Sequence, residues 1–286
     1  MSERRLRLKE TISTDNVIKH KKEAIKKLNS MMEYFINSPS QKHLKKANLL
    51  AYWFENFSQY ILHEDTYDPR RQIRYNRGDI IKLNFGFNVG KEYGGLHYAI
   101  ILDKHNDHNS HVVTVIPLTS GQESEAHKKD VYLGTELFNK LNDKYNTLLV
   151  NARKTQLEAI ELDNKLQHAL SLVNNLLNKE IMKNNGNLEV EASDELQAKF
   201  NSCKELREKS TKKTEDAKLT VESLERSLTE LNKLKVGSIA LIGQITTIDK
   251  ARIYTPRNSR DALYGIRLSD EKMDLINTAV KEQYIF

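Results

Sequence analysis

Residues 136–235 carry the seven-residue apolar repeat of a coiled coil, and they separate two stretches, 76–135 and 236–286, that have the pattern of β-strands. The repeat runs in two arms of similar length around the sequence KNNGN, which holds the only glycine of this segment. This arrangement predicts an antiparallel helical hairpin, whose two ends lie side by side. We therefore expect the strands before and after the hairpin to pair with each other in one domain.

The apolar repeat is regular in the first arm of the hairpin and interrupted in the second. In the first arm it falls on Leu141, Tyr145, Leu148, Ala152, Thr155, Ala159, Leu162, Leu166, Ala169, Val173 and Leu176. In the second arm it is expected to begin at Leu196, Phe200 and Cys203, to fail through the polar stretch REKSTKKT, and to resume at Ala217, Val221, Leu224, Leu228 and Leu231. An arm of ~45 residues would extend roughly 65–70 Å. Because basic and acidic residues balance here, we expect an interaction or dimerisation arm.

The two strand-rich stretches differ in composition from the rest of the chain. Five of the eleven glycines lie in the sequence RGDIIKLNFGFNVGKEYGG, at 77–95. Short apolar runs in DIIKLNF, HYAIILD and HVVTVIPLTS are separated by Gly, Asn and Asp, which indicates antiparallel strands joined by tight turns. After the hairpin, GSIALIGQITTIDKARI predicts further strands, and SDEKMDLINTAVKEQYI predicts a final helix with Ser269 as its N-cap.

Residues 1–75 contain no glycine and have the apolar spacing of two helices. The second predicted helix, with Ser38 or Ser40 as its cap, carries an aromatic-rich stripe that we expect to be core. Its members are Leu44, Leu50, Trp53, Phe54, Phe57 and Ile61. The segment holds fifteen lysines and arginines against nine aspartates and glutamates, whereas the remaining residues balance. This surplus indicates either contact with an anionic partner or a solvated helix face.

Composition also bears on cell compartment and redox chemistry. No apolar run approaches the ~20 residues that cross a bilayer, and the charged N-terminus lacks the apolar stretch of a secretory signal. Cys203 is the single cysteine, so neither an internal disulfide nor a cysteine-based zinc site is expected. We expect a cytoplasmic protein with no membrane partner.

Four ordered motifs then point to a known family. The sequences RGDIIKLNFGFNVGKEYGGLHYAIIL, VVTVIPLTS and GQITTIDKARI, followed by the C-terminal helix, resemble the MazF/PemK toxins of bacterial toxin–antitoxin systems. The resemblance covers 77–135 and 237–286. It implies an α+β fold, namely an SH3-like, partly open β-barrel, to which this chain adds the basic N-terminal helices and the inserted coiled-coil hairpin. It also implies a homodimer.

The same resemblance implies an activity and its partners. Family members are metal-independent endoribonucleases that cut single-stranded RNA, use no cofactor, and are restrained by an antitoxin protein. The threonine of the family's P-L-T-S motif corresponds to Thr119, with Ser120 beside it. The catalytic arginine of the G-x-R-P motif corresponds to His97, and the proline after it to Tyr98. Histidine can act as a base or an acid near neutral pH. Alternatively, loss of the fixed cation marks a site that binds without cutting.

Seven further residues are implied to contact RNA. They are Lys91, Glu92, Gln244, Thr246, Thr247, Lys250 and Arg252. Lys250 and Arg252 could equally be exposed cations at a strand end. The family's Q-x-R-T segment has lost its arginine here, because that position is Thr246. With two arginines missing, the basic N-terminal segment is the expected source of phosphate-binding charge. Its candidate residues are Lys19, Lys21, Lys22, Lys26, Lys27, Arg70, Arg71 and Arg74.

The histidine-rich stretch and the function each allow another interpretation. The sequence KHNDHNSH holds His105, Asp107, His108 and His111, but it lies between two predicted strands, so we expect a polar turn and no metal. As to function, an RNA-cleaving toxin has two rivals. One is a catalytically degenerate barrel that binds nucleic acid or a protein, as a related toxin family with the same barrel binds DNA gyrase. The other is a scaffold built around the coiled coil.

Overall fold

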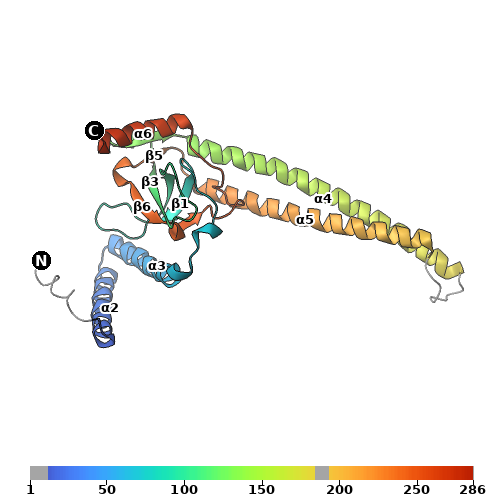
Figure 1. The fold of residues 1–286 in the computed structure, drawn as a ribbon, viewed down its shortest axis with the longest axis horizontal. Coiled ribbons are helices and arrows are strands. Elements are labelled where there is room, and N and C mark those ends of the chain that lie inside the picture. The colour runs from blue at the N-terminus through green and yellow to red at the C-terminus, as the bar shows by residue number, and fades with distance from the viewer. Residues whose placement is uncertain (1–11, 184–192, 286) are drawn as a thin grey trace, which may run out of the picture. The chain divides into compact units, whose positions relative to one another are not determined.

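The computed structural model describes residues 12–183 and 193–285. It confirms the expected α+β class, with helices and one antiparallel sheet (Figure 1). The chain forms two compact units. One comprises Met1–Tyr67 and Gly86–Gly95, and the other comprises Asp68–Phe85 and Leu96–Phe286. The glycine-rich loop 86–95 therefore groups with the N-terminal helices, which the sequence pattern did not predict.

The first unit is built on two helices, α2 (Thr14–Ile36) and α3 (Gln41–His63). Ser40 takes the N-cap position of α3, and Ser38 instead lies 2.7 Å from the Nδ1 atom of His43. The apolar stripe of α3 is only partly covered, because Leu50 is buried and Trp53 and Phe54 are half-buried. The expectation that the whole stripe is core is wrong for its three exposed members, Leu44, Phe57 and Ile61.

The loop of this unit explains why glycines concentrate there. Gly86 and Gly95 have φ angles of 86° and 93°, which favour glycine, and the Gly95 N–H donates to the Gly86 carbonyl at 2.7 Å. A Cβ atom on Gly94 would lie only 2.7 Å from that same carbonyl oxygen. The loop thus closes on itself through backbone approaches that a side chain would block.

The sheet belongs to the second unit. Its strands are β1 (Ile80–Asn84), β2 (Leu96–Ile101), β3 (Val112–Ser120), β4 (Val131–Gly134), β5 (Ser238–Ala240), β6 (Thr246–Asp249) and β7 (Ile253–Thr255). Their order is β4-β5-β3-β2-β1-β7, with β6 also pairing with β3, and every pairing is antiparallel. The outer strands β4 and β7 do not pair with each other, so the sheet is not closed. Strands from both sides of the insertion share the sheet, as expected.

The insertion consists of two long helices, α4 (Glu136–Lys183) and α5 (Asp194–Lys233), which lie side by side (Figure 1). Their 48 and 40 residues would extend about 72 and about 60 Å. Lys213 of α5 forms an ion pair with Glu158 near the middle of α4. Val173, toward the far end of α4, packs with Leu196 near the start of α5. The helices therefore run antiparallel.

The packing seam of the hairpin agrees with the sequence in α4 and differs from it in α5. Seam positions of α4 are buried at Leu141, Ala152, Ala159, Leu166 and Val173. In α5 the buried side chains of Leu196, Cys203 and Ser210 follow one another at seven-residue steps. The seam thus continues into the polar stretch where we expected it to fail, because a small serine fits there. Phe200 is 61% exposed, and its expected place in the seam is wrong.

The core of the second unit lies between the sheet, the start of α4 and the C-terminal helix α6 (Asp270–Tyr284). Ile116 of β3, Leu137 of α4 and Ile276 of α6 are all buried in it. The predicted N-cap Ser269 is confirmed, since its Oγ atom accepts from the Lys272 N–H at 3.3 Å. No helix in the described part of the chain is both long and apolar enough to span a membrane.

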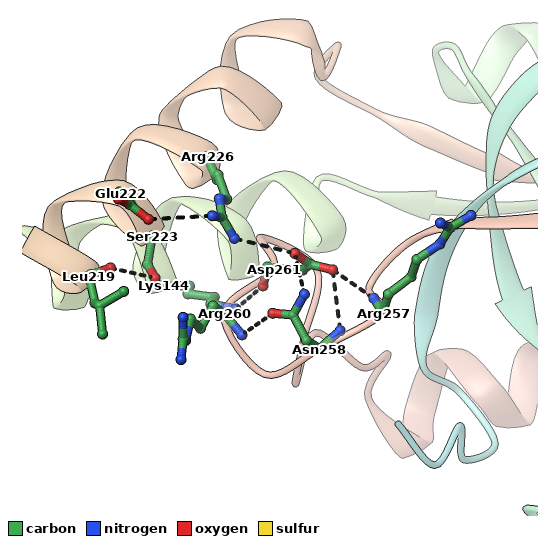
Figure 2. A network of polar contacts seen from close by, with 9 residues as sticks. All are labelled: Lys144, Leu219, Glu222, Ser223, Arg226, Arg257, Asn258, Arg260 and Asp261. Carbon is green, nitrogen blue, oxygen red and sulfur yellow. Dashed lines mark hydrogen bonds and ion pairs between the residues drawn. The ribbon is translucent and has the colours of Figure 1, made fainter. Parts of the chain in front are cut away.

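Both arms of the hairpin are tied to the loop that follows β7. Asp261 lies at the centre of these contacts (Figure 2). Its carboxylate accepts from the Arg257 N–H at 2.6 Å and lies 3.8 Å from the guanidinium of Arg226 on α5. From α4, the Lys144 ammonium donates to the carbonyl oxygens of Asp261 and Tyr264, at 3.0 and 2.7 Å. The base of the hairpin is therefore part of the folded domain.

Candidate functional site

A cavity of about 220 Å³ lies where β2 begins, β3 ends and α5 returns to the sheet. The three residues predicted to be catalytic, His97, Thr119 and Ser120, all line it. His97 and Thr119 are half-buried, and Ser120 is exposed. Residues that are 22 positions apart in the chain thus meet in one hollow.

The strand register explains this meeting. The ladder between β2 and β3 pairs Ala99 with Pro117 and ends there. Extended by two residues, the same register would place His97 opposite Thr119. β3 continues beyond Pro117, and on its other side Thr119 pairs with Ile239 of β5. The ladder between β2 and β3 thus ends before His97 and Thr119, and both residues line the cavity there.

Two residues that line the cavity, Lys82 and Tyr98, form a polar cluster with Glu230 of α5. Lys82 and Tyr98 are directly opposite each other on β1 and β2. The Lys82 ammonium lies 2.5 Å from the Glu230 Oε1 atom, and the Tyr98 hydroxyl donates to the same oxygen. The ammonium also lies 5.0 Å from the centre of the Tyr98 ring. Burial, together with the Glu230 carboxylate, raises the pKa of Tyr98. The Lys82 charge is thereby balanced by a carboxylate from the inserted helix.

This cluster was not predicted from the sequence, although one signal was present. Lys82 interrupts the apolar run IIKLN, and a charge inside a buried strand requires a partner. The partner could not be identified, because Glu230 lies 148 residues away in the chain.

The end of the hairpin also contributes to the cavity, which the sequence did not predict. Lys233 is the last residue of α5, and Lys235 lies in the linker to β5. Both line the cavity together with Leu234. Leu234 packs against the core of the sheet domain.

Among the other predicted RNA contacts, Lys91 and Glu92 are exposed residues of the first unit. The contacts predicted around β6 belong to the second unit and lie away from this cavity. Thr246 and Thr247 of β6 pair with Val115 and Thr114 of β3, and Gln244 precedes them in a short 3₁₀ helix. Along β3, Thr114 is about 17 Å from Thr119, at ~3.4 Å per residue. Gln244, Thr246 and Thr247 are not among the residues that line the cavity.

The two cations after β6 are held by backbone carbonyls. Lys250 is 2% exposed, and its ammonium donates to the Asp107 carbonyl at 2.9 Å. Burial lowers its pKa. The reading of Lys250 as an exposed cation at a strand end is therefore wrong. The Arg252 Nε atom donates to the Asn84 carbonyl at 2.9 Å, which joins this segment to the end of β1.

The histidine-rich sequence lies in the loop between β2 and β3, as expected. The Nε2 atom of His108 lies 2.8 Å from the Gln72 carbonyl oxygen, and the Asp107 carboxylate accepts from the Asn109 N–H at 2.9 Å. Within residues 12–183 and 193–285, no group of three or more His, Cys, Asp or Glu side chains is placed to hold a metal ion.

Comparison with known proteins identifies part of this domain. Residues 76–183 match the family described as the PemK-like, MazF-like toxin of type II toxin–antitoxin systems. The matched segment contains β1 to β4 and α4, and with them His97, Thr119 and Ser120. The match confirms the resemblance for this part of the chain, while the strands after the hairpin lie outside it. The chain has no match among curated proteins.

Proposed function

We propose that this chain, which carries a PemK-like, MazF-like toxin segment at residues 76–183, is an endoribonuclease that cleaves single-stranded RNA without a metal. The observation that carries the proposal is the shared position of His97 and Thr119 at one cavity, beyond the end of the ladder between β2 and β3. An imidazole and a hydroxyl group beside a hollow are the groups that cleavage of a phosphodiester by its own 2′-hydroxyl requires.

The reaction divides between these side chains as follows. The neutral imidazole of His97 takes the proton from the RNA 2′-hydroxyl, whose oxygen forms a new bond to the adjacent phosphorus. The bond from phosphorus to the 5′-oxygen breaks, and the departing oxygen takes a proton from water. Thr119 and Ser120 donate hydrogen bonds to the phosphate oxygens, on which negative charge increases in the transition state. The products are a 2′,3′-cyclic phosphate and a 5′-hydroxyl end.

Partners follow from the same proposal. Because the matched family consists of toxins of type II toxin–antitoxin systems, we propose that an antitoxin protein restrains this chain and that the chain acts as a homodimer. The binding of an antitoxin would be tested by co-purification with the product of a neighbouring gene.

The direct test is incubation of the purified chain with a mixture of single-stranded RNAs in the presence of EDTA. We expect fragments with cyclic phosphate and 5′-hydroxyl ends, and we expect His97→Ala and Thr119→Ala to slow cleavage by about two to four orders of magnitude. Thr114→Ala is the matched control, since it removes a threonine hydroxyl from the same strand as Thr119 but outside the cavity. A His97→Ala protein that cuts at the full rate would remove this histidine from the mechanism.

A catalytically inactive binding module is the second candidate. The observation in its favour is that His97 and Thr246 occupy positions where the family that the chain resembles has arginines, while Lys82, which lines the cavity, is balanced by Glu230. A chain that arrests growth equally well with and without His97, and that leaves RNA intact, would support this candidate.

A further inference from the structure

An RNA phosphate in the proposed site needs positive charge, for which the sequence indicates the N-terminal segment as the source. The cavity itself contains two other sources. Lys233 and Lys235 line it together with His97 and Thr119. Both residues are exposed, and neither ammonium group has a hydrogen bond or ion pair with the described residues. Lys82, by contrast, already has a partner in Glu230.

The segment that carries these lysines is held at its helical end. Glu230 lies three residues before Lys233 and is fixed by Lys82 and Tyr98. The Leu234 N–H donates to the Glu230 and Leu231 carbonyls, each at 3.2 Å. The Leu234 side chain packs into the core of the sheet domain.

The other end of the segment is held by Gly237. Its carbonyl accepts from the Gly121 N–H at 3.3 Å, directly after Ser120. A Cβ atom on Gly237 would lie 2.4 Å from the Gly121 carbonyl oxygen, so the two backbones approach too closely for a side chain. The linker 233–237 is therefore fixed on both sides, and its lysines are pre-positioned at the cavity.

We infer that the inserted hairpin is part of the RNA site, and that Lys233 and Lys235 bind the phosphates next to the scissile bond. This inference rests on the proposed function and extends it. The insertion brings the C-terminal end of α5 to the cavity. Lys233 and Lys235 thereby supply the positive charge that is missing at His97 and Thr246, where the family that the chain resembles has arginines. Lysine ammonium groups serve this role without a fixed hydrogen-bond geometry.

The experiment measures binding of single-stranded RNA as a function of salt concentration, in a His97→Ala background so that the RNA stays intact. For single strands, the logarithm of the affinity falls by ~0.7 per phosphate neutralised for each decade of salt. Replacing both lysines by glutamine should therefore make the slope shallower by about 1.4. The matched control is Lys209→Gln with Lys218→Gln, two exposed lysines of the same helix that do not line the cavity.

The outcomes separate this inference from the proposed function. If the wild-type chain cleaves RNA and the Lys233/Lys235 variant keeps its slope and its kcat/KM, the inference is wrong and the nuclease proposal stands. If the wild-type chain binds RNA without cleaving it and the variant loses slope, the nuclease proposal fails, and of the inference only the binding of RNA phosphates by Lys233 and Lys235 stands. A slope that falls equally in the control variant would overturn the inference, because the effect would then come from total charge. Circular dichroism and thermal unfolding verify that each variant is folded.

Discussion

The hydroxyl group of Tyr98 on β2 donates a hydrogen bond to the carboxylate of Glu230 on α5. The residue beside the candidate base His97 is therefore joined to the inserted hairpin, 132 positions away in the chain. In the family that the chain resembles, the position of Tyr98 is a proline, which has no group to make this bond. The departure from the family motif at this position thus has a structural reason, because Tyr98 binds Glu230 near the end of the inserted hairpin.

Removing the Glu230 carboxylate should destabilise the domain strongly. Glu230→Ala leaves the buried Lys82 ammonium without its partner, and the loss of one member of a buried ion pair costs about 3–5 kcal/mol. Tyr98→Phe removes one hydrogen bond to this carboxylate and should cost less, about 1.5–3 kcal/mol. Urea unfolding measures both changes. Glu225→Ala, at an exposed position of the same helix, is the control, and an equal effect of the two glutamate variants would contradict the proposed role of Glu230.

The close approach of Gly237 to Gly121 gives a second prediction. Gly237→Ala should destabilise the fold by more than Gly134→Ala, although both glycines have positive φ angles, 88° and 69°. A Cβ atom on Gly134 meets nothing within 4 Å, so its cost is the ~1–2 kcal/mol of a left-handed residue. On Gly237 the clash with the Gly121 carbonyl adds to that cost and displaces the segment beside Ser120.

The two glycine variants are compared by denaturant unfolding and by RNA cleavage. We expect Gly237→Ala to lose cleavage under conditions in which it is still folded, while folded Gly134→Ala cleaves normally. Equal losses of stability in the two variants would show that the close backbone approach is not maintained in solution.

Because the Lys144 ammonium is partly buried, the stability of the fold should depend on pH. Burial lowers the pKa of Lys144 in the folded chain to about 8, below the usual value of 10.5. Between these two values the unfolded chain binds more protons at this group than the folded chain does, so this contribution to stability rises with pH. The destabilisation caused by burial of the charged Lys144 ammonium is largest below pH ~8 and disappears above pH ~10.5.

The measurement compares urea unfolding of the wild type and of Lys144→Met from about pH 7.5 to 9.5. The difference between their unfolding free energies should shift in favour of the wild type as the pH rises. Parallel curves would mean that the Lys144 ammonium is as well solvated in the folded chain as in the unfolded one.

Much of the fold could be predicted because its signals are periodic. The seven-residue spacing of Leu196 and Cys203 places both in the seam, and the strand patterns on either side of the insertion belong to one sheet. The exposure of Phe200 was not predictable from hydrophobicity, since a position four residues from Leu196 satisfies the same repeat. Only the actual crossing of the two helices decides which position of the repeat is covered.

The candidate site could be predicted where it depends on local motifs and not where it depends on tertiary contacts. His97 and Thr119 follow from two short sequences, and the antiparallel register brings them together. Lys233 and Lys235 have no motif, and they reach the cavity only because Glu230 and Gly237 fix the linker. The burial of Lys250 could not be predicted from the sequence, because its partner is a backbone carbonyl 143 positions away.

The base and the outer part of the hairpin should behave differently when they are removed. Leu137 is buried in the core of the sheet domain, and Glu230 balances Lys82, so replacing all of 136–235 by a flexible linker should unfold the domain. Deleting only 159–212 and joining the helices by a short glycine-rich turn keeps the Glu158–Lys213 pair and every contact to the cavity.

We expect this shortened protein to fold and to cleave RNA at the wild-type rate. If the outer arm mediates self-association, as its balanced charges and exposed apolar residues such as Ile160 and Phe200 favour, the mass in solution measured by light scattering should fall to that of a smaller assembly. A shortened protein that keeps the wild-type oligomeric state would assign self-association to the sheet domain. A shortened protein that is folded but inactive would show that the outer arm, and not only its base, is needed to hold Lys233 and Lys235 at the cavity.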